Sequence, residues 1–333
     1  MSAFEFTSDD RFARAANAAA DYLCQTECRP LRATFLHLNS RDQNRGNGLI
    51  GQAWTIEALA EAGRKLSRPE LLELADEVFL LHPYDEDKGL WFTIDVNGSN
   101  LGLNPTLNQQ IWFAAAGGLL ATEGSEQVNN AVLRFLDTLP CHIHTHPDGL
   151  IRHRLSFKKR GLVRRFYKYF IKGRKKTDNA SNTLANLENG YHSFTLYGLA
   201  LLHRFHPEHA SWQAKSLRRA IAYANSNKFR RLLDGNPFAY GYNPVGFEMA
   251  FALDQFSLLG QNVRERWVAE QLRRCYDFDR HRMSLNTADP NTLAARIYEA
   301  TRLGNLSLDI AFVDRKQKSF YIKDRNREQR RAL

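Results

Sequence analysis

The segment Glu188-Asn189-Gly190-Tyr191-His192 holds the densest set of chemically reactive side chains in the sequence. These groups start an apolar run, and burial there would move their pKa values toward neutrality, where general acids and bases work. Tyr191 with His192 could abstract and return a proton, as a lyase or an epimerase requires. Glu188 with Glu248 or Asp289 could instead form the carboxylate pair of a glycosidase. The competing interpretation is structural: Glu188 takes part in a helix cap, and His192 is a packed, hydrogen-bonded residue of the wall of the cavity.

A second cluster of polar groups lies in the segment that reads Cys-His-Ile-His-Thr-His-Pro-Asp over 141–148. On a strand, alternation would place His142, His144 and His146 on one face, and three imidazoles can hold a transition metal. The spacing matches no established metal motif, so a polar loop edge, a substrate-contacting loop and a pH-sensitive hinge compete with a metal site. The interpretation that we adopt contains no metal and no cofactor.

Three pairs of residues predict where helices begin. They are Asn104-Pro105, Asn243-Pro244 and Asp289-Pro290, each at the start of an apolar run. Asn and Asp side chains cap helix N-termini, and proline is tolerated at the first helical position. Each pair therefore predicts an N-cap followed by the first helical residue.

Apolar segments of helical length alternate with more charged ones along the chain. The predicted helices are 10–25, 51–63, 69–80, 105–120, 126–136, 190–205, 212–225, 244–259, 263–276 and 290–303. Repeated pairs of an apolar and a charged helix predict inner and outer helices of an all-α fold, the (α/α)6 toroid. We expect one domain over 1–333, with one irregular hairpin.

In such a fold the inner helices begin at one common end. Their unpaired N–H groups and helix dipoles would favour an anionic ligand there. Amides and carboxylates can address sugar hydroxyls while aromatic rings cover C–H faces. The residues that we predict to bind a saccharide are Gln52, Trp54, Asn108, Gln109, Trp112, Tyr242, Asn243, Asp289, Asn291 and Arg296. The catalytic candidates are Glu188, Glu248, Tyr191 and His192.

The net charge of +10 is concentrated in residues 149–177, which hold twelve Lys or Arg and no Asp or Glu. Apolar and basic residues there fall at helical spacing, so we predict a basic amphipathic insertion that contacts an anionic membrane surface or clamps an acidic glycan. A solvated insertion is the third interpretation. The contact candidates are Arg164, Arg165, Phe166, Lys168 and Phe170. The tail 314–333 is also basic, and no nucleic-acid-binding motif is present.

The four cysteines are too few and too scattered for a disulfide framework. The sequence shows no signal peptide and no apolar stretch near the roughly 18 to 20 residues that span a bilayer. We therefore expect a cytoplasmic protein, with peripheral attachment to the inner membrane face as an option.

Three motifs resemble the agl-cluster Q protein family. They are Gly48-Leu-Ile-Gly-Gln-Ala-Trp54, Asn104-Pro-Thr-Leu-Asn-Gln-Gln-Ile-Trp-Phe-Ala-Ala-Ala-Gly117 and Tyr242-Asn-Pro-Val-Gly-Phe-Glu-Met-Ala-Phe251. The resemblance covers most of the chain outside the basic insertion and tail. It implies a six-hairpin toroid and a role in surface-polysaccharide or glycoprotein-glycan assembly. It also implies distant similarity to unsaturated glucuronyl and rhamnogalacturonyl hydrolases, which use an aspartate on an inner helix.

The sequence departs from those hydrolases at the catalytic position. Their Asp-Asn pair matches Leu107-Asn108, where leucine replaces the aspartate. Glu188 and Glu248 are the alternative carboxylates. We expect a carbohydrate-active protein, a glycoside hydrolase or a lyase or epimerase, whose partner is an acidic oligosaccharide or polysaccharide, lipid-linked forms included. The alternative is a non-catalytic glycan-binding or membrane-peripheral scaffold protein.

Overall fold

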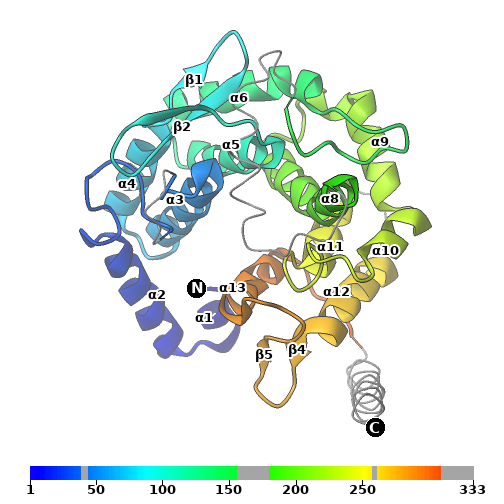
Figure 1. Cartoon of the computed structure of the whole chain (residues 1–333). Coiled ribbons are helices and arrows are strands. Elements are labelled where there is room, and N and C mark those ends of the chain that lie inside the picture. The colour runs from blue at the N-terminus through cyan, green and yellow to red at the C-terminus, as the bar shows by residue number, and fades with distance from the viewer. Residues whose placement is uncertain (39–43, 156–179, 257–260, 309–333) are drawn as a thin grey trace. The chain divides into compact units, whose positions relative to one another are not determined.

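The computed structural model describes residues 1–38, 44–155, 180–256 and 261–308 (Figure 1). The chain divides into two compact units. The first comprises 1–146, 151–177 and 201–218, and the second comprises 147–150, 178–200 and 219–333. Most of the basic insertion and the basic tail lie outside the described residues.

Helical hairpins make up most of the first unit. Its helices are α1 (Ser2–Thr7), α2 (Asp10–Leu23), α3 (Gly48–Lys65), α4 (Pro69–Leu80), α5 (Leu107–Ala121), α6 (Glu126–His142), the end of α8 (Ala180–Phe205), the 3-10 helix η1 (Ala210–Gln213) and the start of α9 (Lys215–Ala224). Helix α3 packs against both α4 and α5, and α5 packs against α6. Every residue of α5 from Leu107 to Leu120 is buried, so α5 is an inner helix of this unit.

Aromatic side chains form the core between α4, α5 and α6. Phe113 of α5 stacks on Phe79 of α4, with ring centroids 4.5 Å apart and planes 7° from parallel. Trp91 packs edge-on against both rings. Gly117 lies one turn after Phe113, and its missing side chain lets the backbone of α5 approach the Phe79 ring and Val132 of α6.

A small antiparallel sheet occupies the connection between α4 and α5. Its strands are β1 (Tyr84–Asp85), β2 (Leu90–Ile94) and β3 (Asn100–Leu103), in the order β1-β2-β3. The buried amide of Gln110 accepts a hydrogen bond from the Trp91 N–H and donates one to the Trp91 carbonyl, both at 2.9 Å. The sequence predicted only a loop here, because strands this short show too little alternation to be recognised.

The second unit is also helical. It holds the first part of α8, the rest of α9, α10 (Asn227–Leu233), α11 (Val245–Gln255), α12 (Gln261–Cys275), the hairpin β4 (Tyr276–Asp277) and β5 (Arg282–Met283), α13 (Pro290–Ala295) and the 3-10 helix η2 (Arg296–Arg302). Helix α11 packs against α12 and η2. Tyr197 of α8 packs on Phe251 of α11, with ring centroids 4.9 Å apart, so α8, α11 and η2 share one core.

One of the three predicted helix starts is confirmed and two are wrong. Asp289 caps α13 by accepting a hydrogen bond from the Thr292 N–H at 3.0 Å, and Pro290 is the first helical residue. Helix α5 begins after Thr106 and α11 after Pro244, and neither Asn104 nor Asn243 caps its helix. Both asparagines are buried. The Asn104 amide donates a hydrogen bond to Gln109 Oε1, and the Asn243 amide donates one to the Gly190 carbonyl.

The other helices largely follow the predicted segments. Helix α4 matches its prediction, and α8 begins ten residues before the predicted Gly190. Helix α10 was not predicted, and the last predicted helix divides into α13 and η2. Among the described residues, none of the helices combines the length and the hydropathy needed to cross a membrane.

Gly117→Ala should lower the melting temperature by several degrees. The added Cβ would lie 2.6 Å from the Phe79 ring and 2.8 Å from Val132 Cγ2, and overpacking of this kind costs about 1 to 3 kcal/mol. Calorimetry of the variant measures the effect. Gly304→Ala is the matched control, because a Cβ there meets no atom within 4 Å. Equal melting temperatures for both variants would contradict the packing described for α5.

Candidate functional site

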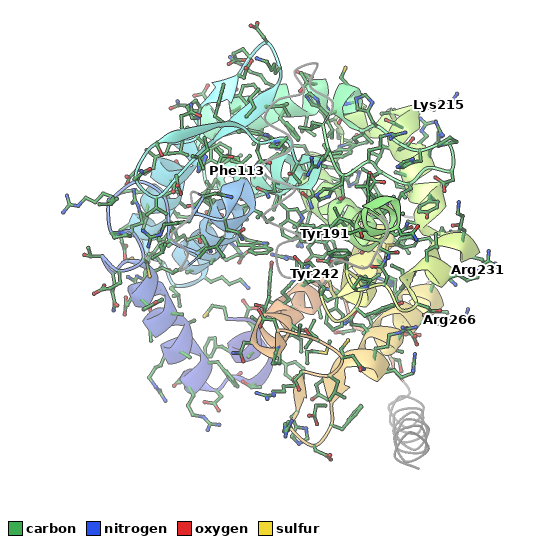
Figure 2. All side chains as sticks on the ribbon, viewed as in Figure 1. Phe113, Tyr191, Lys215, Arg231, Tyr242 and Arg266 are labelled. Carbon is green, nitrogen blue, oxygen red and sulfur yellow. The ribbon has the colours of Figure 1, made fainter. Side chains whose placement is uncertain are left out.

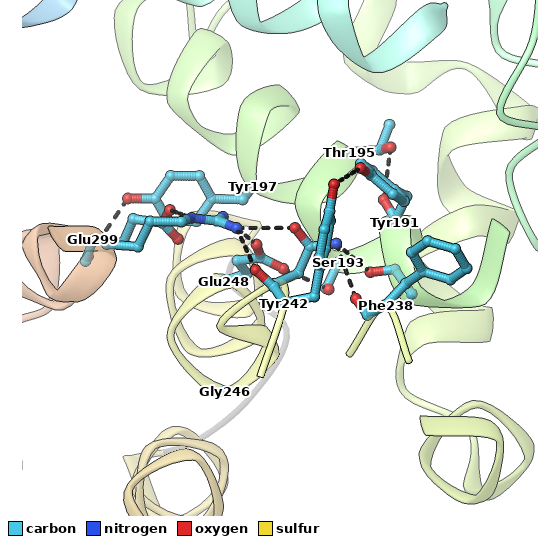
Figure 3. A network of polar contacts seen from close by, with 12 residues as sticks. Tyr191, Ser193, Thr195, Tyr197, Phe238, Tyr242, Gly246, Glu248 and Glu299 are labelled. Atoms are coloured by element: carbon cyan, nitrogen blue, oxygen red, sulfur yellow. Dashed lines mark hydrogen bonds and ion pairs between the residues drawn. The ribbon is translucent and has the colours of Figure 1, made fainter. Parts of the chain in front are cut away.

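A buried arginine lies between two buried glutamates in the second unit (Figure 3). Arg296 Nη2 lies 2.7 Å from Glu248 Oε1, and Arg296 Nε lies 2.7 Å from Glu299 Oε1. Both glutamate side chains are 0% exposed. Glu248 comes from the first turn of α11, whereas Arg296 and Glu299 are one turn apart on η2. This trio is called the Glu–Arg–Glu cluster below.

The Glu–Arg–Glu cluster also binds two other segments of the second unit. Arg296 Nη1 donates to the Asn243 side-chain oxygen at 2.9 Å and to the Tyr242 backbone carbonyl at 3.2 Å. The Ser193 hydroxyl of α8 donates to Glu248 Oε2 at 2.6 Å. One guanidinium therefore ties the loop before α11 to η2, and Glu248 extends the connection to α8.

The two carboxyl groups of the cluster differ in their hydrogen bonding. Glu248 accepts a hydrogen bond on each oxygen, one from Arg296 and one from Ser193. Glu299 accepts one from Arg296, and within the described residues its second oxygen has no hydrogen-bond partner. Burial raises the pKa of both carboxyl groups against the opposing effect of Arg296, and it raises the pKa of Glu299 to about 8. The raised pKa favours the protonated form of Glu299 near neutral pH.

A pair of tyrosines leads from the cluster to solvent. The hydroxyls of Tyr191 and Tyr242 lie 2.8 Å apart. Tyr191 is 8% exposed, whereas Tyr242 is 44% exposed. Burial raises the pKa of Tyr191 well above its usual value, so this phenol stays protonated. The half-exposed Tyr242 is therefore hydrogen-bonded to the buried Tyr191, and the two hydroxyls can exchange a proton.

The cluster fixes the positions of both tyrosines. Tyr242 is held through its own carbonyl by Arg296, and Ser193 lies two residues beyond Tyr191 on α8. Asn243 adds a further connection, because its amide donates to the Gly190 and Phe238 carbonyls, both at 3.0 Å. Of the residues proposed from sequence, the structure thus brings together Tyr191, Tyr242, Asn243, Glu248 and Arg296.

His192 faces a different neighbourhood from Tyr191. Its Nε2 lies 3.0 Å from the Ala220 carbonyl of α9, and its ring packs edge-on against Tyr223 and Phe229. Burial lowers the pKa of His192 to about 4, so the imidazole is neutral at physiological pH. Glu188 is also buried, one turn before His192 on α8.

In the first unit, two of the predicted sugar ligands bind backbone groups. The Gln52 amide donates to the Phe35 and Gly46 carbonyls at 3.0 and 2.9 Å and accepts from the Phe35 N–H at 2.8 Å. Gln109 Oε1 accepts from the Leu49 N–H at 3.1 Å and from the Asn104 amide at 2.8 Å. These amides fix the loop before α3 and the entry into α5.

The remaining predicted ligands fall into three environments. Asn108 is 3% exposed, and among the residues that the structure describes its Oδ1 has no hydrogen-bond partner. The Trp54 and Trp112 rings contact each other edge-on, with centroids 6.3 Å apart. Asp289 and Asn291 are exposed at the start of α13, where Asp289 is the helix cap.

The sequence reasoning missed Ser193 and Glu299. A signal for Glu299 was present, because an Arg and a Glu three residues apart on a helical turn lie side by side. No local pattern identifies Ser193, since its partner Glu248 is 55 residues away in the chain.

The three histidines do not share a strand, because His142 belongs to α6 and residues 143–146 follow its end. His142 is the last residue of α6, and its ring packs near Phe135 with centroids 6.5 Å apart. Across the part of the chain that the structure describes, no group of three or more His, Cys, Asp or Glu side chains could hold a metal ion. The membrane or glycan candidates Arg164, Arg165, Phe166, Lys168 and Phe170 lie outside the described residues.

Comparison with a solved structure defines the class of fold. The chain resembles the cellobiose 2-epimerase from Bacillus thermoamylovorans B4167 with a TM-score of 0.54, covering 83% of this chain and 74% of that one. Sequence identity is 11%, so the similarity concerns the fold alone. The protein has the (α/α)6 toroid fold, as the sequence predicted.

A curated relative defines the family. The chain is 38% identical over 322 residues to archaeal glycosylation protein Q from Haloferax volcanii, across 92% of this chain and 86% of the relative. The chain therefore belongs to the archaeal glycosylation protein Q family, which confirms the resemblance seen in its motifs. No protein-family model matches the sequence.

Glu299→Gln should change how stability depends on pH. The folded-state pKa of Glu299, about 8, lies above the ordinary value of 4.5, so folding takes up a proton between these values. Wild-type stability should therefore fall relative to the variant as pH rises from about 5 to 8. Urea unfolding across this range measures the difference. Glu73→Gln, an exposed change on α4, is the control, and a pH-independent difference for Glu299→Gln would refute the assignment.

Arg296→Met should destabilise the protein strongly. Removing the guanidinium leaves two buried carboxyl groups without their cation, a loss that costs about 3 to 5 kcal/mol in buried ion pairs. Arg264→Met removes a partly exposed ion pair with Asp254 and should cost less than about 1 kcal/mol. Unfolding free energies from urea titrations compare the two variants. A similar cost for both would show that the cluster does not organise the second unit.

Proposed function

We propose that this protein is an enzyme of glycan metabolism that moves protons on an acidic saccharide, as an epimerase or a lyase does. The observation that carries the proposal is the 2.8 Å contact between the hydroxyls of buried Tyr191 and of Tyr242, a residue that is 44% exposed. Acid and base groups must lie within hydrogen-bond reach of each other and of the reacting atom to pass a proton. Membership of the archaeal glycosylation protein Q family supports a saccharide as the substrate.

The surroundings of Glu248 argue against the two-carboxylate hydrolysis in which it would act with Glu188. Glu248 is buried, and its two oxygens accept hydrogen bonds from Arg296 and Ser193. The carboxyl group that shares Arg296 with it is Glu299, which the sequence analysis did not name. Glu248 and Glu299 both bind Arg296, at 2.7 Å each. A glycosidase needs its two carboxyl groups on either side of the scissile bond, with the sugar between them. Here the guanidinium occupies the space between these carboxyl groups. The cluster is therefore better suited to positioning the tyrosines than to cleaving a bond itself.

Tyr242 and Tyr191 would have different roles in proton transfer. Tyr242 is half-exposed and meets the substrate, whereas Tyr191 lies behind it with a raised pKa. A Tyr242 phenolate would take the carbon-bound proton and later give it back to carbon, while Tyr191 keeps its own proton and donates a hydrogen bond to the Tyr242 oxygen. Burial raises the pKa of Tyr191, so this phenol remains a hydrogen-bond donor, and the positive charge of Arg296 only partly opposes that effect.

The start of α11 lies near the phenol pair, since this helix of eleven residues begins at Val245, three residues after Tyr242. Its Gly246 N–H donates to Gln271 Oε1 and its Phe247 N–H donates to the Pro244 carbonyl, so these groups are not free to bind an anion. The partial positive charge of the helix N-terminus is the feature that supports an acidic substrate.

Proton transfer can be tested with uronic-acid oligosaccharides in D2O. Glucuronate-containing and mannuronate-containing oligosaccharides are the probes, and NMR measures deuterium bound to carbon. The wild type should incorporate deuterium or form an unsaturated product, and Tyr191→Phe should slow that reaction by about 100-fold or more, as loss of a general acid or base does. Tyr22→Phe makes the same change on the exposed face of α2 and should keep the wild-type rate.

Each outcome of this experiment identifies a reaction class. Deuterium without a double bond indicates epimerisation, and an unsaturated product indicates elimination. New reducing ends with neither deuterium nor an unsaturated product would overturn the proposal in favour of hydrolysis. Binding of the oligosaccharides without any reaction would overturn it in favour of a glycan-binding or scaffold protein.

A further inference from the structure

Three outer helices of the second unit pack side by side. Tyr223 of α9 lies 5.6 Å from Phe229 of α10 between ring centroids, and Phe229 lies 6.4 Å from Trp267 of α12. This row of buried rings holds α10 between α9 and α12. The opposite sides of the three helices remain exposed, so they form one outward surface of the unit.

That surface is rich in exposed cations. Between residues 209 and 233 the chain has six Lys or Arg and no Asp or Glu. The exposed basic residues of this part of the second unit are Arg219, Lys228, Arg230, Arg231 and Arg266. In Figure 2 the side chains of Arg231 and Arg266 extend outward from α10 and α12, whereas Tyr191 and Tyr242 lie on the inner side. The exposed group Arg230, Arg231 and Arg266, together with Leu232, is called the basic face.

Other cations on these helices are neutralised by carboxylates. Arg264 pairs with Asp254, and Lys228 pairs with Asp148. On α12, Arg273 and Arg274 both pair with Glu270, and Arg274 also pairs with Asp234. The acidic groups near this surface are thus largely occupied.

The arginines of the basic face differ from these. Within the described ranges, Arg230, Arg231 and Arg266 have no carboxylate within 4.0 Å. Arg230 instead lies over the Trp267 ring, 5.3 Å from its centroid. Glu265 is the neighbouring acid on α12, and it accepts a hydrogen bond from the Ser307 N–H at 3.0 Å. Three guanidinium groups therefore present uncompensated positive charge to solvent.

An apolar side chain is exposed among these charges. Leu232 follows Arg231 on α10 and is 41% exposed. Cations beside an exposed apolar residue on a surface helix are typical of segments that lie on anionic lipid, where the charge meets headgroups and the apolar side chain enters the interface. We propose that the basic face binds the surface of an anionic lipid membrane. This inference goes beyond the proposed function and does not depend on the saccharide chemistry.

Flotation of the full-length protein with lipid vesicles tests the proposal. The wild type should float with vesicles of phosphatidylglycerol and phosphatidylcholine and stay behind with phosphatidylcholine alone. Arg230→Glu/Arg231→Glu/Arg266→Glu should weaken binding by about 100-fold or more, since each cation near such a surface strengthens binding roughly fivefold. Leu232→Ala should weaken it less, and raised salt should weaken wild-type binding.

A triple control separates the basic face from net charge. Arg11→Glu/Arg14→Glu/Arg134→Glu changes the net charge equally at exposed positions on α2 and α6 and should leave flotation intact. Equal loss in both triple variants, unchanged flotation of the basic-face variant, or failure of the wild type to bind would overturn the proposal. Binding of RNA in place of vesicles would also overturn it. Deuterium incorporation into soluble oligosaccharides by the basic-face variant shows separately whether the proposed reaction stands.

Discussion

The buried guanidinium of Arg296 is the interaction on which the organisation of the second unit depends. Moving a cation out of water costs free energy unless it forms ion pairs and its N–H groups donate hydrogen bonds. Arg296 meets this demand with two glutamates, an asparagine side chain and a backbone carbonyl. Because these partners come from α11, the loop before it and η2, satisfying one side chain fixes three segments at once. Burial raises the pKa of Glu299 to about 8 against the effect of Arg296.

In the first unit, buried neutral amides and not charged groups connect the segments. Gln52, Gln109 and Gln110 are buried, and each binds main-chain groups. Gln52 binds the loop before α3, Gln109 binds the Leu49 N–H at the start of α3, and Gln110 binds Trp91 of β2. A side-chain amide has both donors and an acceptor, so it can pair with a backbone N–H and a carbonyl. Asn108 differs, because within the described residues its buried oxygen has no hydrogen-bond partner.

The functional proposal follows from the way the cluster holds the tyrosines. An exposed phenol alone would move freely, and a buried phenol alone would not meet a substrate. Tyr242 is accessible, yet its backbone is held by Arg296 and its hydroxyl by Tyr191. This combination of access and fixed position is what proton transfer requires. The (α/α)6 fold and membership of the archaeal glycosylation protein Q family agree with a role in carbohydrate chemistry.

Local sequence determined the helices, the cap at Asp289 and the fold class, because apolar periodicity and capping act over a few neighbouring residues. The family was also readable from short motifs. Five members of the candidate site were named from the sequence, but their grouping was not. Only the tertiary structure decided that Arg296 meets Glu248, 48 residues away, and that His192 turns toward α9. Both contacts depend on which helix faces pack together. That packing is determined by residues far apart in the chain, which bury apolar surface and pair their charges with one another.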